Sequence, residues 1–300
     1  MSSAPSAPPS RDAHDQGRSG RSAAACPPRA RTRLSRLAPR AVLLAVLGMA
    51  TTGCTSNAFT RLGWPVPVTK QGQVALTLWQ GSWIAAWIVG AVVWGMIIWA
   101  IIFHRKKRGP APPPHQVRYN LPIEMLYTVV PFIMIGVLFF FTARDENYID
   151  KLPAHPDVTV IVTGYQWSWS FQYKNYPVPG SPTGYVTENG EPWSPQAGNS
   201  QLPVLVIPEN ETVRFDLVST DVIHAFWIIP FEFKRDVIPG HPNHFEVTPT
   251  RTYSGIGRCT ELCGLYHSRM LFKVRIVTPA QFNLWIHAQQ AAQQKAGSAQ

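Results

Sequence analysis

The sequence predicts a two-helix membrane hairpin followed by an all-β sandwich, and three observations lead to this fold class. Charged residues make up 15% of the chain, against about 25% in ordinary soluble domains. Two long apolar runs lie on either side of a short basic segment in the first half of the chain. From residue 157 onward, apolar and polar residues alternate in short runs separated by turns, which is typical of strands.

The net charge of +10 is unevenly distributed along the chain. Residues 1–142 carry 15 Lys and Arg against 3 Asp and Glu, whereas residues 143–300 carry 12 against 14. The basic excess therefore belongs to the N-terminal region, and the second half is mildly acidic, which favours basic partners. No nucleic-acid-binding motif is recognisable, so we expect no nucleic-acid partner.

Residues 1–53 are expected to form a disordered leader and an export signal. Residues 1–28, which include Cys26, lack periodicity and are rich in Ser, Ala, Pro and Arg. Five arginines then precede the apolar run 41–50, which is too short to span a membrane but suits a signal peptide. The following Thr51-Thr52-Gly53-Cys54 resembles a bacterial lipobox, although Leu usually stands where Thr51 does. Either Cys54 is lipidated and begins the mature chain, or ordinary signal cleavage occurs nearby.

After a mature N-terminal segment at 54–78, two transmembrane helices are predicted at 79–103 and 121–143. The connecting segment 104–120 opens with the basic cluster His104–Arg108 and is proline-rich, so we expect a cytoplasmic loop. Pro131 is expected to kink the second helix. Everything after residue 143 would then lie outside the cell. Glu124, at the inner start of the second helix, either has a function or is a solvated carboxylate.

The predicted β-domain covers residues 144–280. The expected strands lie near 158–162, 204–207, 212–218, 224–229, 244–247, 252–254 and 271–277. In the third of these, Val213, Phe215 and Leu217 share one face. Residues 174–201, rich in Pro, Gly, Ser and Asn, are expected to form a long excursion, and 281–300 a short C-terminal helix and tail.

A cluster of soft and imidazole ligands lies near the end of this domain. Cys259, Cys263, His267 and Met270 fall within twelve residues, and such side chains select copper, zinc or iron–sulfur. His224, which opens an apolar run, is the best distant candidate. Zinc would leave Met270 unexplained, and a mononuclear blue copper site would leave one cysteine unexplained. A dinuclear copper centre would use all of these side chains, whereas a Cys259–Cys263 disulfide would explain neither His267 nor Met270.

The spacing Cys-x-Glu-x-Cys-Gly-x3-His-x2-Met after a membrane hairpin resembles subunit II of cytochrome c oxidase. Three further stretches, at 124–131, 164–170 and 221–240, resemble the same family. The resemblance covers residues 75–290. It implies a cupredoxin-like sandwich that carries a dinuclear copper A centre and accepts electrons from cytochrome c.

The resemblance also implies individual roles. Cys259 and Cys263 would bridge two coppers, His224 and His267 would each bind one, and Met270 and the Glu261 carbonyl would be weak ligands. The Glu261 side chain would bind magnesium at the boundary with subunit I. Trp167 would be where electrons enter, and Glu124 would lie at the mouth of a proton pathway into subunit I. Ser168 departs from the family, which commonly has an aromatic residue there, and acidic residues near Trp167 are sparse.

The implied protein is thus the electron-accepting subunit of a proton-translocating oxidoreductase. Its partners would be subunits I and III in the cell membrane, and oxygen would be reduced in subunit I. The copper domain would lie on the outer face, and its donor would be a soluble or membrane-anchored cytochrome c. The alternative is a membrane-anchored copper-binding or copper-delivery protein that acts alone.

Overall fold

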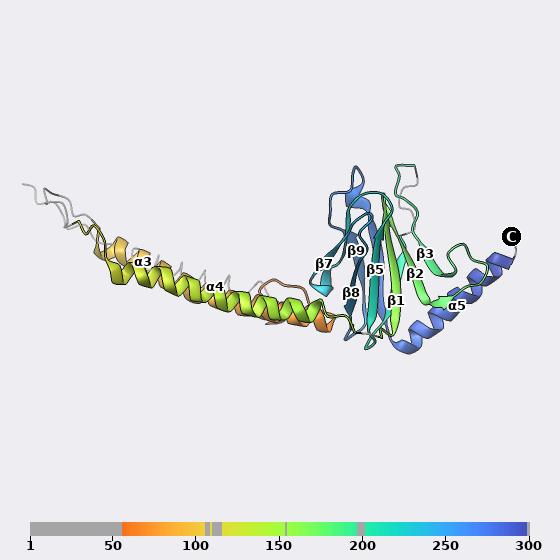
Figure 1. Ribbon diagram of the computed structural model, residues 1–300, viewed down its shortest axis with the longest axis horizontal. Coiled ribbons are helices and arrows are strands. Elements are labelled where there is room, and N and C mark those ends of the chain that lie inside the picture. The colour runs from red at the N-terminus through yellow and green to blue at the C-terminus, as the bar shows by residue number, and fades with distance from the viewer. Residues whose placement is uncertain (1–55, 106–108, 110–115, 154, 197–201, 299–300) are drawn as a thin grey trace, which may run out of the picture. The chain divides into compact units, whose positions relative to one another are not determined.

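A computed structural model describes residues 56–105, 109, 116–153, 155–196 and 202–298. The predicted export signal, Cys26 and Cys54 lie outside these residues, as does most of the basic loop. A short helix, α2 (Ser56–Thr60), precedes two long helices, α3 (Lys70–Phe103) and α4 (Leu121–Ile149). These two helices run side by side (Figure 1).

Both long helices are apolar and exposed along their central parts. Their most apolar windows have mean hydropathies of 2.3 and 2.2, and none of either window is buried within the chain. At about 1.5 Å rise per residue, each exceeds the hydrocarbon thickness of about 30 Å. Their length and composition therefore suit membrane anchoring.

Helix α3 begins nine residues before the predicted apolar run, because its first turn is capped and packed on the β-domain. The Thr69 hydroxyl accepts a hydrogen bond from the Gly72 amide at 2.9 Å. The Val68 amide donates to the Pro230 carbonyl at 3.1 Å. A Cβ on Gly72 would lie 2.9 Å from the Phe231 carbonyl oxygen, so this contact requires glycine. Helix α4 likewise extends beyond the predicted end, and Pro131 lies inside it.

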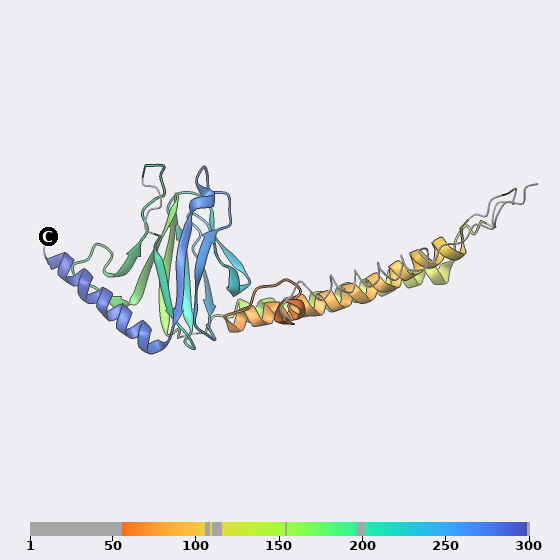
Figure 2. The same ribbon diagram turned by 180° about the vertical axis from the view of Figure 1, so that it is seen from behind.

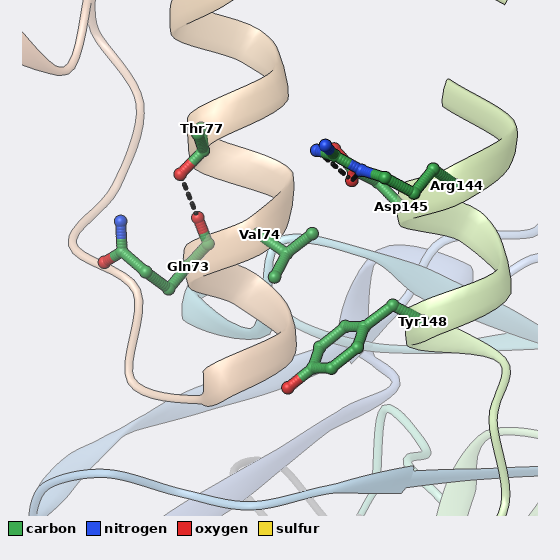
Figure 3. Close-up of a pocket in the computed structure, with 6 residues that line it drawn as sticks. All are labelled: Gln73, Val74, Thr77, Arg144, Asp145 and Tyr148. Atoms are coloured by element: carbon green, nitrogen blue, oxygen red, sulfur yellow. Dashed lines mark hydrogen bonds and ion pairs between the residues drawn. The ribbon is translucent and has the colours of Figure 1, made fainter. Parts of the chain in front are cut away.

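A pocket of about 340 Å³ lies between the two helices (Figure 3). Gln73, Val74 and Thr77 line it from α3, and Arg144, Asp145 and Tyr148 from α4. Asp145 is 4% exposed and accepts hydrogen bonds from the Arg144 guanidinium. None of the predicted metal ligands lines this pocket.

The β-domain consists of two five-stranded sheets packed face to face (Figure 1). One has the order β3-β2-β1-β5-β8 and the other β4-β10-β9-β6-β7. The strands are β1 (Val158–Tyr165), β2 (Ser168–Pro177), β3 (Tyr185–Asn189), β4 (Val204–Pro208), β5 (Val213–Ser219), β6 (His224–Ile228), β7 (Lys234–Val237), β8 (Asn243–Val247), β9 (Tyr253–Cys259) and β10 (Leu271–Val277). Short 3-10 turns, η1 (Ile229–Phe231) and η2 (His267–Arg269), interrupt the series.

The core between the sheets is mainly aromatic and β-branched. The predicted face of Val213, Phe215 and Leu217 is fully buried, which confirms the alternation inferred for β5. Phe226 of β6 stacks on Phe272 of β10 with ring centroids 4.9 Å apart. This packing holds the ends of β6, β9 and β10 in place.

Three features differ from the sequence prediction. Strands β2 and β7 were not expected, and the excursion at 174–201 contains β3 and the end of β2. The C-terminal helix is longer than a short, fraying helix, because α5 (Pro279–Ser298) packs on the sandwich (Figure 2). Phe282 and Ile286 are buried against the core, and the Gln293 side chain is hydrogen-bonded to the backbone of Thr187.

Candidate metal centre

The predicted ligands come from two neighbouring strands of one sheet, β6 and β9, and from the loop that joins β9 to β10. His224 begins β6 and Cys259 ends β9, and these strands pair so that Phe226 lies opposite Cys259. Cys263 and His267 lie in the loop between β9 and β10, and Met270 immediately precedes β10. The Cys259 amide donates to the Met270 carbonyl at 3.0 Å, which closes this loop. Residues up to 46 positions apart are thereby brought to one end of the sandwich.

The side chains converge on one point. The Nδ1 atom of His224 lies 3.8 Å from the Cys259 Sγ, and the two sulfurs are 3.9 Å apart. The Cys263 Sγ lies 3.5 Å from the His267 Nδ1 and 3.7 Å from the Met270 Sδ. The Glu261 carbonyl oxygen lies 3.2 Å from the Cys259 Sγ. The ligand atoms of His224, Cys259 and Cys263 all lie within 4.8 Å of one another.

This set of donors fits copper. Among the described residues, Cys259 and Cys263 are free cysteines, so the predicted alternative of a disulfide between them is not formed. His224 and Met270 are fully buried, and both sulfurs of the cysteine pair are nearly so. Thiolates, imidazoles and a thioether in a buried cluster form a soft ligand set.

Asp221 orients the His224 ring. Its carboxylate lies 2.8 Å from the His224 Nε2, which leaves the Nδ1 atom facing Cys259. The same carboxylate accepts hydrogen bonds from the Gln166 amide at 2.7 Å and the Val222 amide at 2.6 Å. Partial burial opposes ionisation of Asp221, but these hydrogen bonds outweigh it and hold its pKa below the usual range. A carboxylate behind a histidine is a common arrangement at metal sites.

The two thiols differ in acidity. Burial opposes ionisation of Cys259, but hydrogen bonds, above all with His224, lower the pKa of this thiol below its usual value. Burial and the neighbouring Cys259 together raise the pKa of Cys263 to about 12. Cys259 is therefore the more acidic thiol of the pair, and metal binding requires both thiols to lose their protons.

Trp167 directly contacts the loop between β9 and β10, which carries Cys263 and His267 and which we call the ligand loop. Its indole Nε1 donates to the Cys263 carbonyl at 3.2 Å, and the Gln166 side chain donates to the same oxygen at 2.7 Å. The ring packs against Gly264, which has a φ of +117° and whose Cβ would lie 3.2 Å from the indole. Glycine is needed there both for its backbone conformation and for this approach.

The remaining predicted residues lie elsewhere or point outward. The side chain of Glu261 is exposed, although its carbonyl faces the cluster. Glu124 lies in the first turn of α4, where its carboxylate accepts a hydrogen bond from the Asn120 amide at 3.0 Å. Glu124 therefore caps the helix N-terminus, which is a structural role.

Sequence reasoning missed several residues around the cluster. Asp221 lies in one of the stretches that resemble the family, but no role was predicted for it. Its position three residues before His224 could have indicated a carboxylate that orients the imidazole ring. Gln166 gave no signal of its own. Tyr266 and Trp193 lie next to Trp167, with the Tyr266 ring 4.8 Å from Trp167 and 4.4 Å from Trp193.

Comparisons with known proteins agree with this arrangement. The family model described as "Cytochrome C oxidase subunit II, periplasmic domain" matches residues 158–277. A probable cytochrome c oxidase subunit 2 from Streptomyces avermitilis is 49% identical, over 80% of this chain and 83% of the relative. Its counterpart from Streptomyces coelicolor is 48% identical, with the same coverage.

Among solved structures, the periplasmic domain of cytochrome oxidase subunit II (CoxB) from Bradyrhizobium japonicum is 29% identical. That match covers 47% of this chain and 99% of the other, with a TM-score of 0.39. The two apolar helices, the cupredoxin-like sandwich and the extent of the curated matches lead to one conclusion: the chain belongs to the cytochrome c oxidase subunit II family.

Proposed function

We propose that this chain accepts electrons from cytochrome c at a dinuclear copper A centre and passes them to the haem-copper subunit I. The observation that carries the proposal is the convergence of two thiols, two imidazoles, one thioether and one carbonyl, of which both thiols, the His224 imidazole and the thioether are buried. The oxidase as a whole would reduce oxygen to water and pump protons. Subunits I and III would be the membrane partners.

Cys259 and Cys263 would hold two copper ions between them, with His224 on one and His267 on the other. Met270 and the Glu261 carbonyl would complete the set as weak ligands. The bound centre would supply one-electron redox chemistry, with the charge shared over two metals and two sulfurs. This centre uses both thiols, both imidazoles and the thioether as ligands. A zinc site would leave Met270 without a role as a ligand, and a blue copper site would leave one cysteine without one.

The chain itself holds these ligands rigidly and keeps water away from them. His224, Met270 and both cysteines are buried, and the ligand loop is joined to β6 by the bond from the Thr260 amide to the Ala225 carbonyl. Asp221 fixes the His224 ring. Because these ligands are held in place, they would move little when an electron arrives or leaves, and the reorganisation energy of each transfer would be small. Trp167, bonded to the Cys263 carbonyl, would be where electrons enter.

The exposed Glu261 side chain supports a second role, as a ligand to magnesium at the boundary with subunit I. Glu124 would additionally lie at the mouth of a proton pathway into subunit I. The basic segment after α3 supports an arrangement in which the copper domain lies on the outer face of the cell membrane. Cys54 would be the lipidated residue if the signal is of the lipoprotein type.

The test is purification of the full chain from membranes by an affinity tag, in mild detergent. We expect haem-containing subunit I to copurify in equal amount, and the preparation to oxidise a reduced c-type cytochrome with consumption of oxygen. Recovery of a copper protein without haem and without this activity would instead favour the stand-alone copper-binding or copper-delivery protein.

A further inference from the structure

A second cavity lies where the two long helices meet the β-domain. It has a volume of about 460 Å³, and Asp145 borders both this cavity and the pocket in Figure 3. Its walls come from the segment before α3, from α3, from the end of α4 and from the turn between η1 and β7. We call it the junction cavity, and its lining includes Trp64, Trp79, Asp145, Glu146, Asp150 and Glu232. Its volume is that of a small-ligand site.

Buried polar atoms without a partner are concentrated around the junction cavity. Within the described residues, seven buried side-chain nitrogen and oxygen atoms form no hydrogen bond, and four of them belong to residues that line this cavity. They are the indole Nε1 atoms of Trp64 and Trp79 and both carboxylate oxygens of Glu232. The two indole rings lie together, with centroids 4.5 Å apart. Because buried polar groups are nearly always hydrogen-bonded, this concentration indicates a polar ligand that accepts from the indoles and donates to the carboxylate.

The junction cavity also carries an excess of negative charge. Two of its four acidic residues, Asp145 and Asp150, are paired with neighbouring arginines (Figure 3 shows the first pair). The other two, Glu146 and Glu232, form no ion pair within the described part of the chain. Burial raises the pKa of Glu232 to about 8, against the opposing charge of Arg61. A ligand with a cationic donor group would supply the missing countercharge.

The acidic groups of the junction cavity do not converge on one point, as a metal ion would require. Among the described residues, the set of potential ligand atoms that lie close enough together to hold an ion belongs to the metal cluster described above. The ligand is therefore extended, with its cation in one place and its hydrogen-bond acceptors in another. The cavity also has apolar walls, formed in part by Leu78, Ile149 and Phe233. An amphiphilic molecule fits both kinds of wall.

The junction cavity lies at the ends of the two apolar spans. Trp79 begins the first apolar run, and residues 142–150, which include the α4 wall of the cavity, lie at the end of the second. The basic segment 104–108 lies at the opposite end of both helices. Tryptophan side chains are enriched at membrane–water boundaries, at the level of the lipid headgroups. A membrane phospholipid can therefore reach the cavity with its polar end.

We propose that the junction cavity binds a phospholipid whose headgroup carries a primary ammonium group beside its phosphate, as in phosphatidylethanolamine. The ammonium group donates hydrogen bonds to the Glu232 carboxylate, and headgroup oxygens accept from the indoles of Trp64 and Trp79. The acyl chains follow the apolar wall of Leu78 and Ile149. An anionic headgroup without an ammonium group would be repelled by the carboxylates, and a choline headgroup has no N–H to donate. The proposal depends neither on copper nor on electron transfer.

The test is photolabelling of the full chain, purified in mild detergent with the subunits that accompany it. The probe is phosphatidylethanolamine with a diazirine at the start of one acyl chain, and labelled peptides are located by mass spectrometry. Unlabelled phosphatidylethanolamine, phosphatidylcholine and phosphatidylglycerol compete with the probe. Glu232→Gln removes the charge, and Trp79→Phe removes the indole N–H but keeps an aromatic ring. The matched controls are Glu209→Gln, which is half-buried after β4, and Trp99→Phe, which is exposed on α3; neither residue lines the cavity.

We expect labels within residues 75–82 of α3 and 142–149 of α4. Unlabelled phosphatidylethanolamine should compete about tenfold better than either other lipid, because it alone supplies a charged N–H donor. Glu232→Gln should weaken the affinity for the probe about tenfold and Trp79→Phe about threefold, and both controls should leave it unchanged. The copper spectrum should be the same in all variants, since no metal ligand lines the cavity.

Equal competition by the three lipids would overturn the proposal, because the helices would then be surrounded by lipid without selecting a headgroup. So would labelling that is unchanged in both Glu232→Gln and Trp79→Phe, or absent from these segments in the wild type, where water or another subunit would then fill the cavity. If Glu232→Gln did not assemble, Trp79→Phe and the lipid competition in the wild type would decide. None of these results involves cytochrome c oxidation, so a failure here would leave the proposed function standing, whereas a haem-free wild-type preparation would count against that function alone.

Discussion

Replacing Asp221 by Asn should weaken copper binding without unfolding the β-domain. The carboxylate accepts hydrogen bonds from three N–H groups, on His224, Gln166 and Val222, at 2.6–2.8 Å. An asparagine offers one oxygen and one NH2 group, so at least one donor would face another donor. If the NH2 group faced His224, the Nε2 atom would have to accept, and Nδ1, which faces Cys259, would carry the hydrogen.

Loss of such an orienting partner typically costs about 10–100-fold in metal affinity, which corresponds to about 1.4–2.7 kcal/mol. The Asp221 side chain is 30% exposed, so we expect at most about 1–2 kcal/mol of lost folding stability. Copper affinity is measured by competition with a chelator of known affinity. Asp216→Asn is the matched control, since its carboxylate pairs at 3.5 Å with Lys174 on the surface. Equal copper affinities in the wild type and Asp221→Asn would refute the orienting role of this carboxylate.

Three further predictions concern single residues. Met270→Leu should shift the reduction potential and visible spectrum of the copper centre while costing less than about 1.5 kcal/mol of stability, because the volumes match; an identical spectrum would exclude Met270 as a ligand. Gly264→Ala should cost about 1–3 kcal/mol, because φ is +117° and the new Cβ would crowd Trp167; cytochrome c oxidation should slow, and an unchanged rate and thermal unfolding midpoint would contradict the packing described. Burial raises the pKa of Glu232 from an ordinary value of 4.5 to about 8, against the opposing charge of Arg61. The free energy of unfolding should therefore be unaffected by Glu232 below pH 4.5 and should fall as the pH rises to about 8. Glu232→Gln should then raise the thermal unfolding midpoint at pH 9 but not at pH 4. An equal change at both pH values would contradict this.

The fold class could be predicted because its signals are local. Two apolar runs around a basic segment, and the alternation seen in Val213, Phe215 and Leu217, each follow from a few neighbouring residues. Strand β2 was missed because Trp169 and Phe171 are buried together with Ser168 and Ser170, so the polar–apolar alternation is lost. The length of α5 was missed because its stability comes from packing on the sandwich, through Phe282 and Ile286.

The metal cluster could be predicted because its donors are chemically distinctive and closely spaced. What surrounds it could not, since Asp221, Gln166 and Trp193 become neighbours of the cluster only through strand pairing and loop packing. Glu124 was singled out by its sequence pattern; its carboxylate accepts a hydrogen bond from the Asn120 amide at the start of α4, and its place in a proton pathway stays a prediction.

The central claim is that Cys259, Cys263, His224, His267 and Met270 hold two coppers that share charge. The most direct measurement is electron paramagnetic resonance of the oxidised, purified complex, together with a metal count per haem. Two coppers sharing one unpaired electron should give a seven-line hyperfine pattern, and Cys263→Ser should abolish it. One copper with a four-line pattern, or zinc with no signal, would contradict the dinuclear centre and the electron relay built on it.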